Sequence, residues 1–267
     1  AFGFELMAAR GDIRPGSPEA QRFVAGALKD VVMHEVGHAL GLRHNFRGST
    51  GIKFEQLRDA AFTRQRGISN SVRDYNARNI PLEDEAVADY HQTTLGNYDY
   101  WAIEYAYREI APENEAAELA RIAARSATDP SLAYATDEDV IAALGGAIDP
   151  LVNQWDLSEE PLAYYKRSLL LARELWTRTK ERELAPGDDF TVYRRNLGRG
   201  LGQFAGVVGP LSRYVGGVHT SRQLAGYTSG GLFTPVPVVQ QREALNLLTL
   251  EVFSSSSFRF DPVFMSK

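Results

Sequence analysis

Four residues near the start of the chain have types and a spacing that suit metal-dependent hydrolysis: His34, Glu35, His38 and His44. On an α-helix, residues four apart lie on one face, so His34 and His38 can bind the same zinc ion. Glu35 then lies beside the metal, where its carboxylate can take a proton from water. Gly41 lets the chain reverse and bring in His44 as a third ligand. Three neutral imidazoles leave a position open for water or substrate, which is typical of a catalytic zinc site.

Two less specific interpretations compete with this one. The histidines could be unrelated residues of a surface helix, but a chance match to the whole pattern has a probability on the order of 10⁻⁵. A structural zinc site is the other alternative, and Glu35 would have no task there. Of the two remaining histidines, His91 is interpreted as a solvated or capping residue. His219 is interpreted as a hydrogen-bonded loop residue that could instead line a substrate groove.

A long helix must position the motif, and the sequence marks both of its ends. Ser17 is a suitable N-cap, Pro18 suits the first helical position, and Glu19 favours the positive helix end. Gly41 can end the helix in the left-handed conformation. Between these residues, a period close to 3.6 predicts a helix from Pro18 to about Leu40. Its apolar positions are Phe23, Val24, Leu28, Val31, Val32, Val36 and Leu40.

The chain is predicted to be mainly α, with few and weak strand signals. A short helix is expected to begin at Asp137 and to stop at Gly145-Gly146. Other helices are expected near 53–66, 97–108, 113–126, 160–183, 188–214 and 238–253. Residues 42–52, 67–81 and 223–237 have the composition of loops. Proline and glycine cluster within 127–160, which predicts a first region of residues 1–126 with the zinc helix and a helical C-terminal region of residues 127–267.

Composition narrows the possible partners. The formal net charge is -5 with both signs interspersed, which argues against nucleic-acid binding through phosphate contacts. No cysteine is present, so disulfides, thiolate zinc ligands and a cysteine nucleophile are excluded. The longest uncharged stretch, 223–241, is broken by glycine and proline and does not suit a membrane span. The first residues do not resemble a signal peptide, and we expect the chain to be part of a longer protein.

The segment HEVGHALGLRH matches HExxHxxGxxH, the long zinc signature of the metzincin clan. The chain resembles the bacterial met-zincin family of large secreted zinc-dependent metallopeptidases. Further segments that carry the resemblance are SNSVRDYNARNI (69–80), TTLGNYDYWAIEYAY (93–107), RYVGGVHTSR (213–222) and VQQREALNLL (239–248). The resemblance implies Zn²⁺ on His34, His38 and His44, Glu35 as general base, and a peptide or protein substrate. It also implies a periplasmic or extracellular location, and an α+β fold in the intact protein whose upstream sheet lies largely outside this chain.

The same resemblance places residues 71–75 at the Met-turn, a tight turn beneath the metal that is usually written SVMxY. Arg73 occupies the methionine position, which is a departure. A buried guanidinium beside a dication is costly. Arg73 must therefore point elsewhere with a rearranged turn, or zinc affinity must fall. Tyr75 matches a tyrosine that some metzincins place near the metal, where its hydroxyl could bind zinc or an oxyanion; the alternative is a packed tyrosine.

Three functional hypotheses follow. The first is a zinc-dependent endopeptidase-like enzyme in which Glu35 activates water. The second, motivated by Arg73 and the missing sheet, is a zinc-binding module that is catalytically impaired. The third is a zinc hydrolase for an ester or a small amide. Asp74 is a candidate to orient a zinc-binding histidine, and Trp155 and Trp176 are expected to be core residues or groove walls. The sequence gives neither the cleavage specificity nor the oligomeric state.

Overall fold

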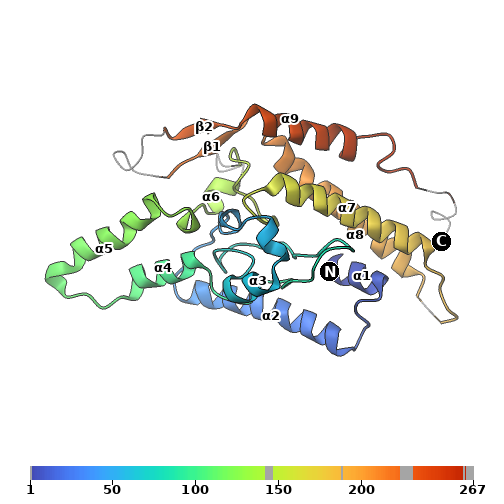
Figure 1. The fold of residues 1–267 in the computed structure, drawn as a ribbon, viewed down its shortest axis with the longest axis horizontal. Coiled ribbons are helices and arrows are strands. Elements are labelled where there is room, and N and C mark those ends of the chain that lie inside the picture. The colour runs from blue at the N-terminus through green and yellow to red at the C-terminus, as the bar shows by residue number, and fades with distance from the viewer. Residues whose placement is uncertain (1, 142–146, 188, 223–230, 261, 263–267) are drawn as a thin grey trace. The chain divides into compact units, whose positions relative to one another are not determined.

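The computed structural model describes residues 2–141, 147–187, 189–222, 231–260 and 262 (Figure 1). The structure is 56% helical and contains a single two-stranded sheet among the described residues, which confirms the mainly α class. The predicted helix stop at Gly145-Gly146 lies outside the described residues.

Nine α-helices and two strands are described. The helices are α1 (Phe2–Arg10), α2 (Pro18–Ala39), α3 (Ala60–Arg66), α4 (Asn97–Tyr107), α5 (Glu115–Ala124), α6 (Asp137–Val140), α7 (Pro161–Glu181), α8 (Thr191–Ser212) and α9 (Val238–Asn246). A π-helical turn, Leu247–Val252, follows α9. The strands β1 (Val218–Thr220) and β2 (Phe233–Pro235) pair antiparallel, with His219 opposite Thr234. The sequence predicted most of these helices; it missed α1 and placed β2 within a loop.

The chain divides into two compact units. The first unit comprises Ala1–Ala25, Leu162–Val215 and Pro237–Lys267, and the second comprises Gly26–Pro161 and Gly216–Val236. This division by spatial contact runs across the predicted regions 1–126 and 127–267, because each unit combines segments from both. The two regions stay a prediction about sequence organisation.

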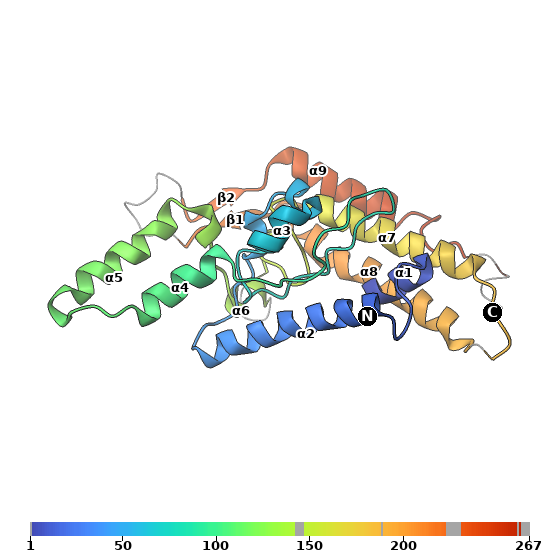
Figure 2. The ribbon, with the colours of Figure 1, turned by 60° about the horizontal axis from the view of Figure 1, so that its bottom comes forward.

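In the first unit, α7 and α8 run side by side (Figure 2). Trp176 of α7 stacks on Phe204 of α8, with ring centroids 5.1 Å apart. This close approach requires Gly200, since a Cβ there would lie 2.1 Å from the Trp176 indole nitrogen. Trp176 is buried, as expected for a core residue.

The second unit contains long irregular segments that are fixed by buried hydrogen bonds. The Gln92 side chain accepts from the backbone N–H groups of Ile68 and Ser69 and donates to the Ser69 carbonyl. Gly96 packs so closely that a Cβ would lie 2.0 Å from the Asn70 backbone. Buried backbone groups need such partners when no helix or sheet supplies them. These contacts fix the loop that passes beneath the candidate site.

Both predicted ends of α2 are confirmed. The Ser17 hydroxyl accepts from the Ala20 N–H at 3.2 Å, which is an N-cap contact. Gly41 adopts a φ of +81°, the left-handed conformation that ends the helix. The apolar positions of α2, however, do not all face a core: Leu28 is 60% exposed and Val32 is 58% exposed.

Candidate metal centre

Three histidines converge at one end of α2. His34 and His38 project from the helix and His44 comes from the loop that follows Gly41, so that one ring nitrogen of each lies within 4.8 Å of the others. His34 is buried, His44 is half-buried and His38 is exposed. The structure therefore brings together all three residues that the sequence proposed as ligands.

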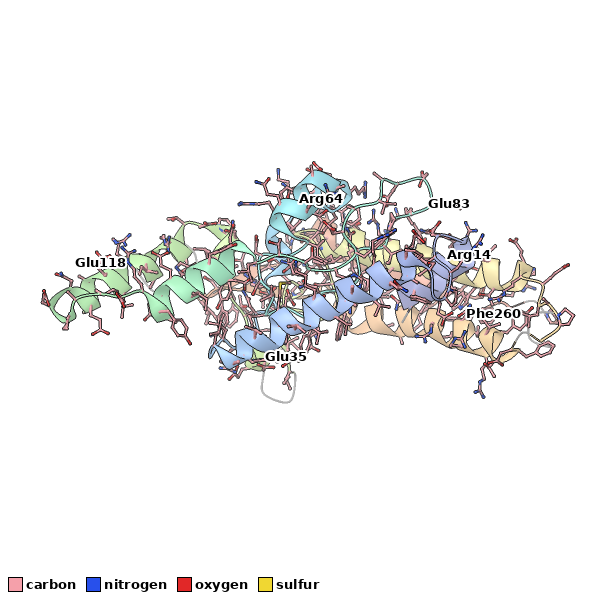
Figure 3. The ribbon with its side chains drawn as sticks, turned by 90° about the horizontal axis from the view of Figure 1, so that it is seen from below. Arg14, Glu35, Arg64, Glu83, Glu118 and Phe260 are labelled. Carbon is pink, nitrogen blue, oxygen red and sulfur yellow. The ribbon has the colours of Figure 1, made fainter. Side chains whose placement is uncertain are left out.

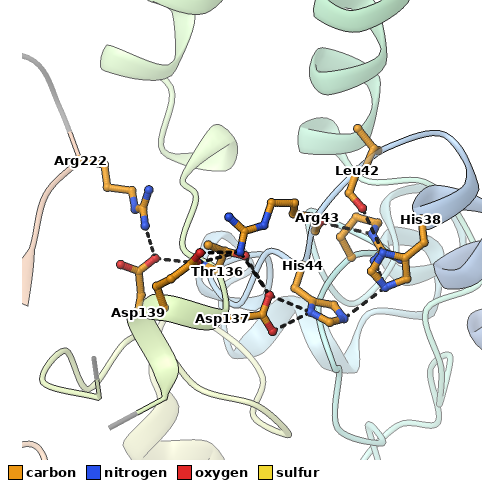
Figure 4. Close-up of polar contacts among 10 residues, drawn as sticks. His38, Leu42, Arg43, His44, Thr136, Asp137, Asp139 and Arg222 are labelled. Carbon is orange, nitrogen blue, oxygen red and sulfur yellow. Dashed lines mark hydrogen bonds and ion pairs between the residues drawn. The ribbon is translucent and has the colours of Figure 1, made fainter. Parts of the chain in front are cut away.

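Each imidazole is held through its Nδ1 atom. His34 Nδ1 lies 2.8 Å from the Val72 carbonyl oxygen and His38 Nδ1 lies 3.1 Å from the Leu42 carbonyl oxygen. His44 Nδ1 lies 2.9 Å from a carboxylate oxygen of Asp137 (Figure 4). Because a carbonyl can only accept, the Nδ1 atom of His34 carries the proton. The Leu42 carbonyl favours the same tautomer for His38, although the Arg73 guanidinium also contacts both ring nitrogens of His38. The same tautomer suits His44 beside a carboxylate. In this tautomer each ring offers its Nε2 atom as a metal ligand, and at His38 the Arg73 guanidinium also contacts that atom.

The spacing of these lone pairs matches zinc geometry. The Nε2 atoms of His38 and His44 lie 3.3 Å apart. Tetrahedral coordination with Zn–N bonds of ~2.1 Å places two ligand nitrogens ~3.4 Å apart. Two unprotonated nitrogens cannot hydrogen-bond to each other, and this distance is the one that two ligands of a shared zinc ion would adopt. The donor set therefore fits zinc.

The electrostatics also favour neutral imidazoles. Burial, followed by the charge of Arg73, lowers the pKa of His34 to about 4. The same two causes lower the pKa of His38, while Glu35 acts in the opposite direction. Neutral histidine is the form that binds metal, so no proton needs to be displaced at neutral pH.

Glu35 follows His34 on α2, and its side chain is exposed (Figure 3). Its carboxylate acts electrostatically on His38 and on Arg73, which places it in the neighbourhood of the cluster. The position is consistent with a base that faces solvent and incoming substrate.

The structure shows whether Arg73, at the methionine position of the Met-turn pattern, points away from the histidines. The side chain is fully buried and points into the site, where its guanidinium contacts the His38 ring and donates to the His34 carbonyl oxygen. Gly37 makes room for it, since a Cβ there would lie 2.5 Å from Arg73 Cδ. Burial lowers the pKa of Arg73. The alternative in which Arg73 points away is therefore wrong.

The turn that carries Arg73 is held from α4. Asp99 accepts from the Ser71 hydroxyl at 2.8 Å and from the Val72 N–H at 3.0 Å. The Val72 carbonyl in turn receives His34. Asp99 thus helps to position His34, because it holds the Val72 peptide that His34 contacts. Its place in the sequence did not indicate this role.

Tyr75 packs against the histidines. Its ring centroid lies 4.7 Å from that of His44 and 5.2 Å from that of His34. No hydrogen bond joins its hydroxyl to another residue in the described part of the chain. The ring is packed, but the backbone partner for its hydroxyl that the packed-tyrosine alternative requires is not among the described bonds, so the role of Tyr75 stays a prediction.

Two expectations about supporting residues were wrong. Asp74 does not orient a histidine; its carboxylate is buried and accepts from the Ser49 N–H at 2.9 Å. Asp137 takes that role for His44. His91 is not solvated: it is buried against α2, where a Cβ on Gly26 would lie 3.0 Å from its Nδ1. Nothing in the sequence fixes the approach of position 137 to position 44.

The last histidine is hydrogen-bonded, as expected, but it lies on β1 and not in a loop. His219 Nδ1 lies 3.1 Å from a carboxylate oxygen of the buried Asp149. Asp149 also accepts from the Thr220 N–H and pairs with Arg47. Through Asp149, these bonds connect β1 to Arg47, which follows His44 in the chain.

Comparison with known proteins agrees with this geometry. A sequence model of the Met-zincin family matches residues 16–266. The chain belongs to the Met-zincin family. The match includes the whole histidine cluster, all of the second unit and most of the first. No curated protein and no solved structure matches the chain significantly. No helix among the described residues has the length and hydropathy that a membrane crossing requires.

Proposed function

We propose that this Met-zincin is a zinc-dependent peptidase that hydrolyses peptide bonds with Glu35 as the general base. The observation that carries the proposal is the set of three imidazoles, each anchored through Nδ1, with the His38 and His44 Nε2 atoms at ligand spacing. The adjacent exposed carboxylate of Glu35 supplies a base. A purely structural zinc site would not require it.

The residues of the chain divide the chemical work. When bound, zinc supplies Lewis-acid polarisation of the scissile carbonyl and lowers the pKa of a nearby water. His34, His38 and His44 hold the ion. Glu35 takes the proton of the attacking water and returns it to the leaving amine. The Tyr75 hydroxyl, which has no other described partner, donates a hydrogen bond to the oxyanion.

The decisive variant is Glu35→Gln, which keeps size and removes basicity. We expect turnover of a mixed peptide library to fall by at least ~100-fold, while zinc content stays stoichiometric. The matched control is Glu19→Gln on the same helix, where the carboxylate pairs with Arg22 and is exposed. The proposal fails if the Glu35 variant cleaves peptides at the wild-type rate.

A second candidate function is a zinc-binding module without turnover. Arg73 favours it, because the guanidinium adds a positive charge beside His38. Wild-type protein with stoichiometric zinc and no cleavage of any library peptide would support this candidate over the first.

The substrate class and the location belong to the same proposal. We expect a peptide or protein substrate and a periplasmic or extracellular location, as in the secreted peptidases that the sequence resembles. Fractionation of cells that express the natural gene tests the location.

A further inference from the structure

Trp155 has a backbone conformation that its side chain does not favour. Its φ is +66°, in the left-handed region that bulky residues avoid. Such a conformation is unfavourable for a bulky side chain and persists only where the surroundings enforce it. The Trp155 N–H donates to the Tyr75 carbonyl at 2.8 Å, which ties the backbone of the two loops together.

The indole gains little burial in return. Trp155 is 58% exposed, although tryptophan is among the side chains that gain most from burial. One face of the indole stacks on Tyr75, with centroids 5.3 Å apart and an interplanar angle of 21°. More than half of the residue's surface stays open to solvent. A strained and exposed tryptophan is not explained by stability.

The position of the indole relates it to the metal centre. Tyr75 lies between Trp155 and His44, and each of these two ring contacts spans about 5 Å. An extended peptide advances ~3.4 Å per residue. A peptide whose scissile bond lies at the histidines would therefore pass the indole within about three residues.

We propose that Trp155 contacts the substrate and selects an apolar side chain close to the scissile bond. The inference rests on the proposed peptidase function and adds a specificity-determining residue to it. The exposed indole face offers an apolar, aromatic surface, and its rigid stack on Tyr75 lowers the entropy cost of ordering it on binding. The class of ligand is a peptide with a leucine-like or phenylalanine-like side chain near the cleaved bond.

The first test compares Trp155→Gly and Trp155→Phe with the wild type on paired peptides. The members of a pair differ only in leucine or glycine near the cleaved bond. Glycine accepts a φ of +66° without strain, so Trp155→Gly should unfold within a few degrees of the wild type. We expect Trp155→Gly to lower kcat/KM about tenfold for the leucine peptide and less than about twofold for the glycine peptide. Trp155→Phe should recover part of the preference.

The matched control is Tyr100→Ala, which removes an equally exposed aromatic side chain of the same unit from α4. It should leave the preference intact. Equal losses for both peptides, confined to kcat, would show that Trp155 acts only through Tyr75 and would overturn the inference. Unchanged kinetics of Trp155→Gly would overturn it as well.

A binding measurement separates this inference from the peptidase proposal. Zinc-loaded Glu35→Gln protein is titrated with the leucine peptide while tryptophan fluorescence is recorded. A fluorescence change that disappears when Trp155→Phe is combined with Glu35→Gln supports the inference. This holds even if the wild type shows no turnover and the peptidase proposal fails. A change that survives this substitution, or no change at all, overturns the inference whether or not the enzyme is active.

Discussion

At the residue scale, the strongest support of the candidate metal centre comes from a contact that spans 93 positions in the sequence. Asp137 accepts from His44 with both carboxylate oxygens, at 2.9 and 3.1 Å. Although burial works against it, the bond from His44 lowers the pKa of Asp137. The carboxylate thus stays charged and keeps His44 in the tautomer that presents Nε2.

Asp137→Ala should therefore weaken zinc binding. Loss of such an outer carboxylate typically costs 10–100-fold in metal affinity, and we expect about that range. Chelator competition measures the affinity. The visible spectrum of the Co²⁺ form reports the ligand geometry, which a general loss of stability would not change.

Glu138→Gln is the control for this substitution. It removes the same charge from the same helix, α6, but its carboxylate pairs with Arg43 and not with His44. We expect zinc affinity within about threefold of the wild type. Equal losses in the two variants would mean that charge near the site matters and orientation of His44 does not.

Arg73 has the opposite effect on the metal. At an effective dielectric constant of ~20, a unit charge ~5 Å from a dication raises its energy by several kcal/mol. Arg73→Met removes the charge and restores the residue type of the Met-turn pattern. We expect zinc affinity to rise at least about tenfold. Arg78→Met, at an arginine that faces Asp30, should leave it unchanged; a rise in both variants would refute a local effect of Arg73.

Whether a site residue was predictable depended on how far along the chain its partner lies. His34, Glu35 and His38 were predictable because helix geometry alone fixes their relation. His44 needed only one glycine turn. Asp137 and Asp99 were not predictable, since their approach to the metal centre depends on the path of long loops. Arg73 was recognised as unusual, but only the structure shows that Gly37 leaves room for it beneath the histidines.

At the element scale, α2 shows which features of a helix a local sequence pattern can predict. Ser17 and Gly41 marked its ends because capping depends on residues close in sequence. The apolar period did not reveal which side is covered: Leu28 and Val32 are exposed. β2 was not predicted because its three residues, Phe233–Pro235, are too few to show an alternation of apolar and polar side chains. They form a strand only by pairing with β1, which lies further back in the sequence.

The turn at Gly41 can be tested as an element. Gly41→Ala adds a Cβ at a φ of +81°, where nothing crowds it but the conformation itself is unfavourable. We expect a loss of about 1 kcal/mol in unfolding free energy and weaker zinc binding, because His44 depends on the turn. Gly41→Asn should lose less.

The control for this turn is Gly198→Ala. Position 198 lies inside α8 with open space around it, so alanine should stabilise by up to about 1 kcal/mol. Denaturant titration measures both changes. If Gly41→Ala were as stable as the wild type and bound zinc equally well, the left-handed turn would not be what positions His44.

At the scale of the whole molecule, the family match over residues 16–266 agrees with the sequence resemblance, whereas the grouping into two units does not follow from sequence order. Global stability also depends on buried ionisable groups far from the metal. Burial, followed by the charge of Arg78, lowers the pKa of His91 to about 3. Burial raises the pKa of Asp30 to about 6, against the attraction of Arg78.

These two groups shift the pH dependence of stability in opposite directions. Between about pH 3 and 6.5 the unfolded state binds the proton of His91 that the folded state refuses, so stability falls as the pH drops. Between about pH 4 and 6 the folded state keeps the proton on Asp30 that the unfolded state releases, so stability falls as the pH rises. In the wild type the two slopes largely offset each other between pH 4 and 6.

Each substitution should expose the slope of the other group. We expect Asp30→Asn to become more stable with rising pH between 4 and 6, relative to the wild type, by up to ~1.4 kcal/mol per pH unit. His91→Gln should change in the opposite sense over the same interval. Denaturant titrations at pH 4, 5, 6 and 7 measure these slopes, with a chelator present so that zinc release does not contribute. Parallel pH profiles for the wild type and both variants would show that neither buried group titrates abnormally in the folded state.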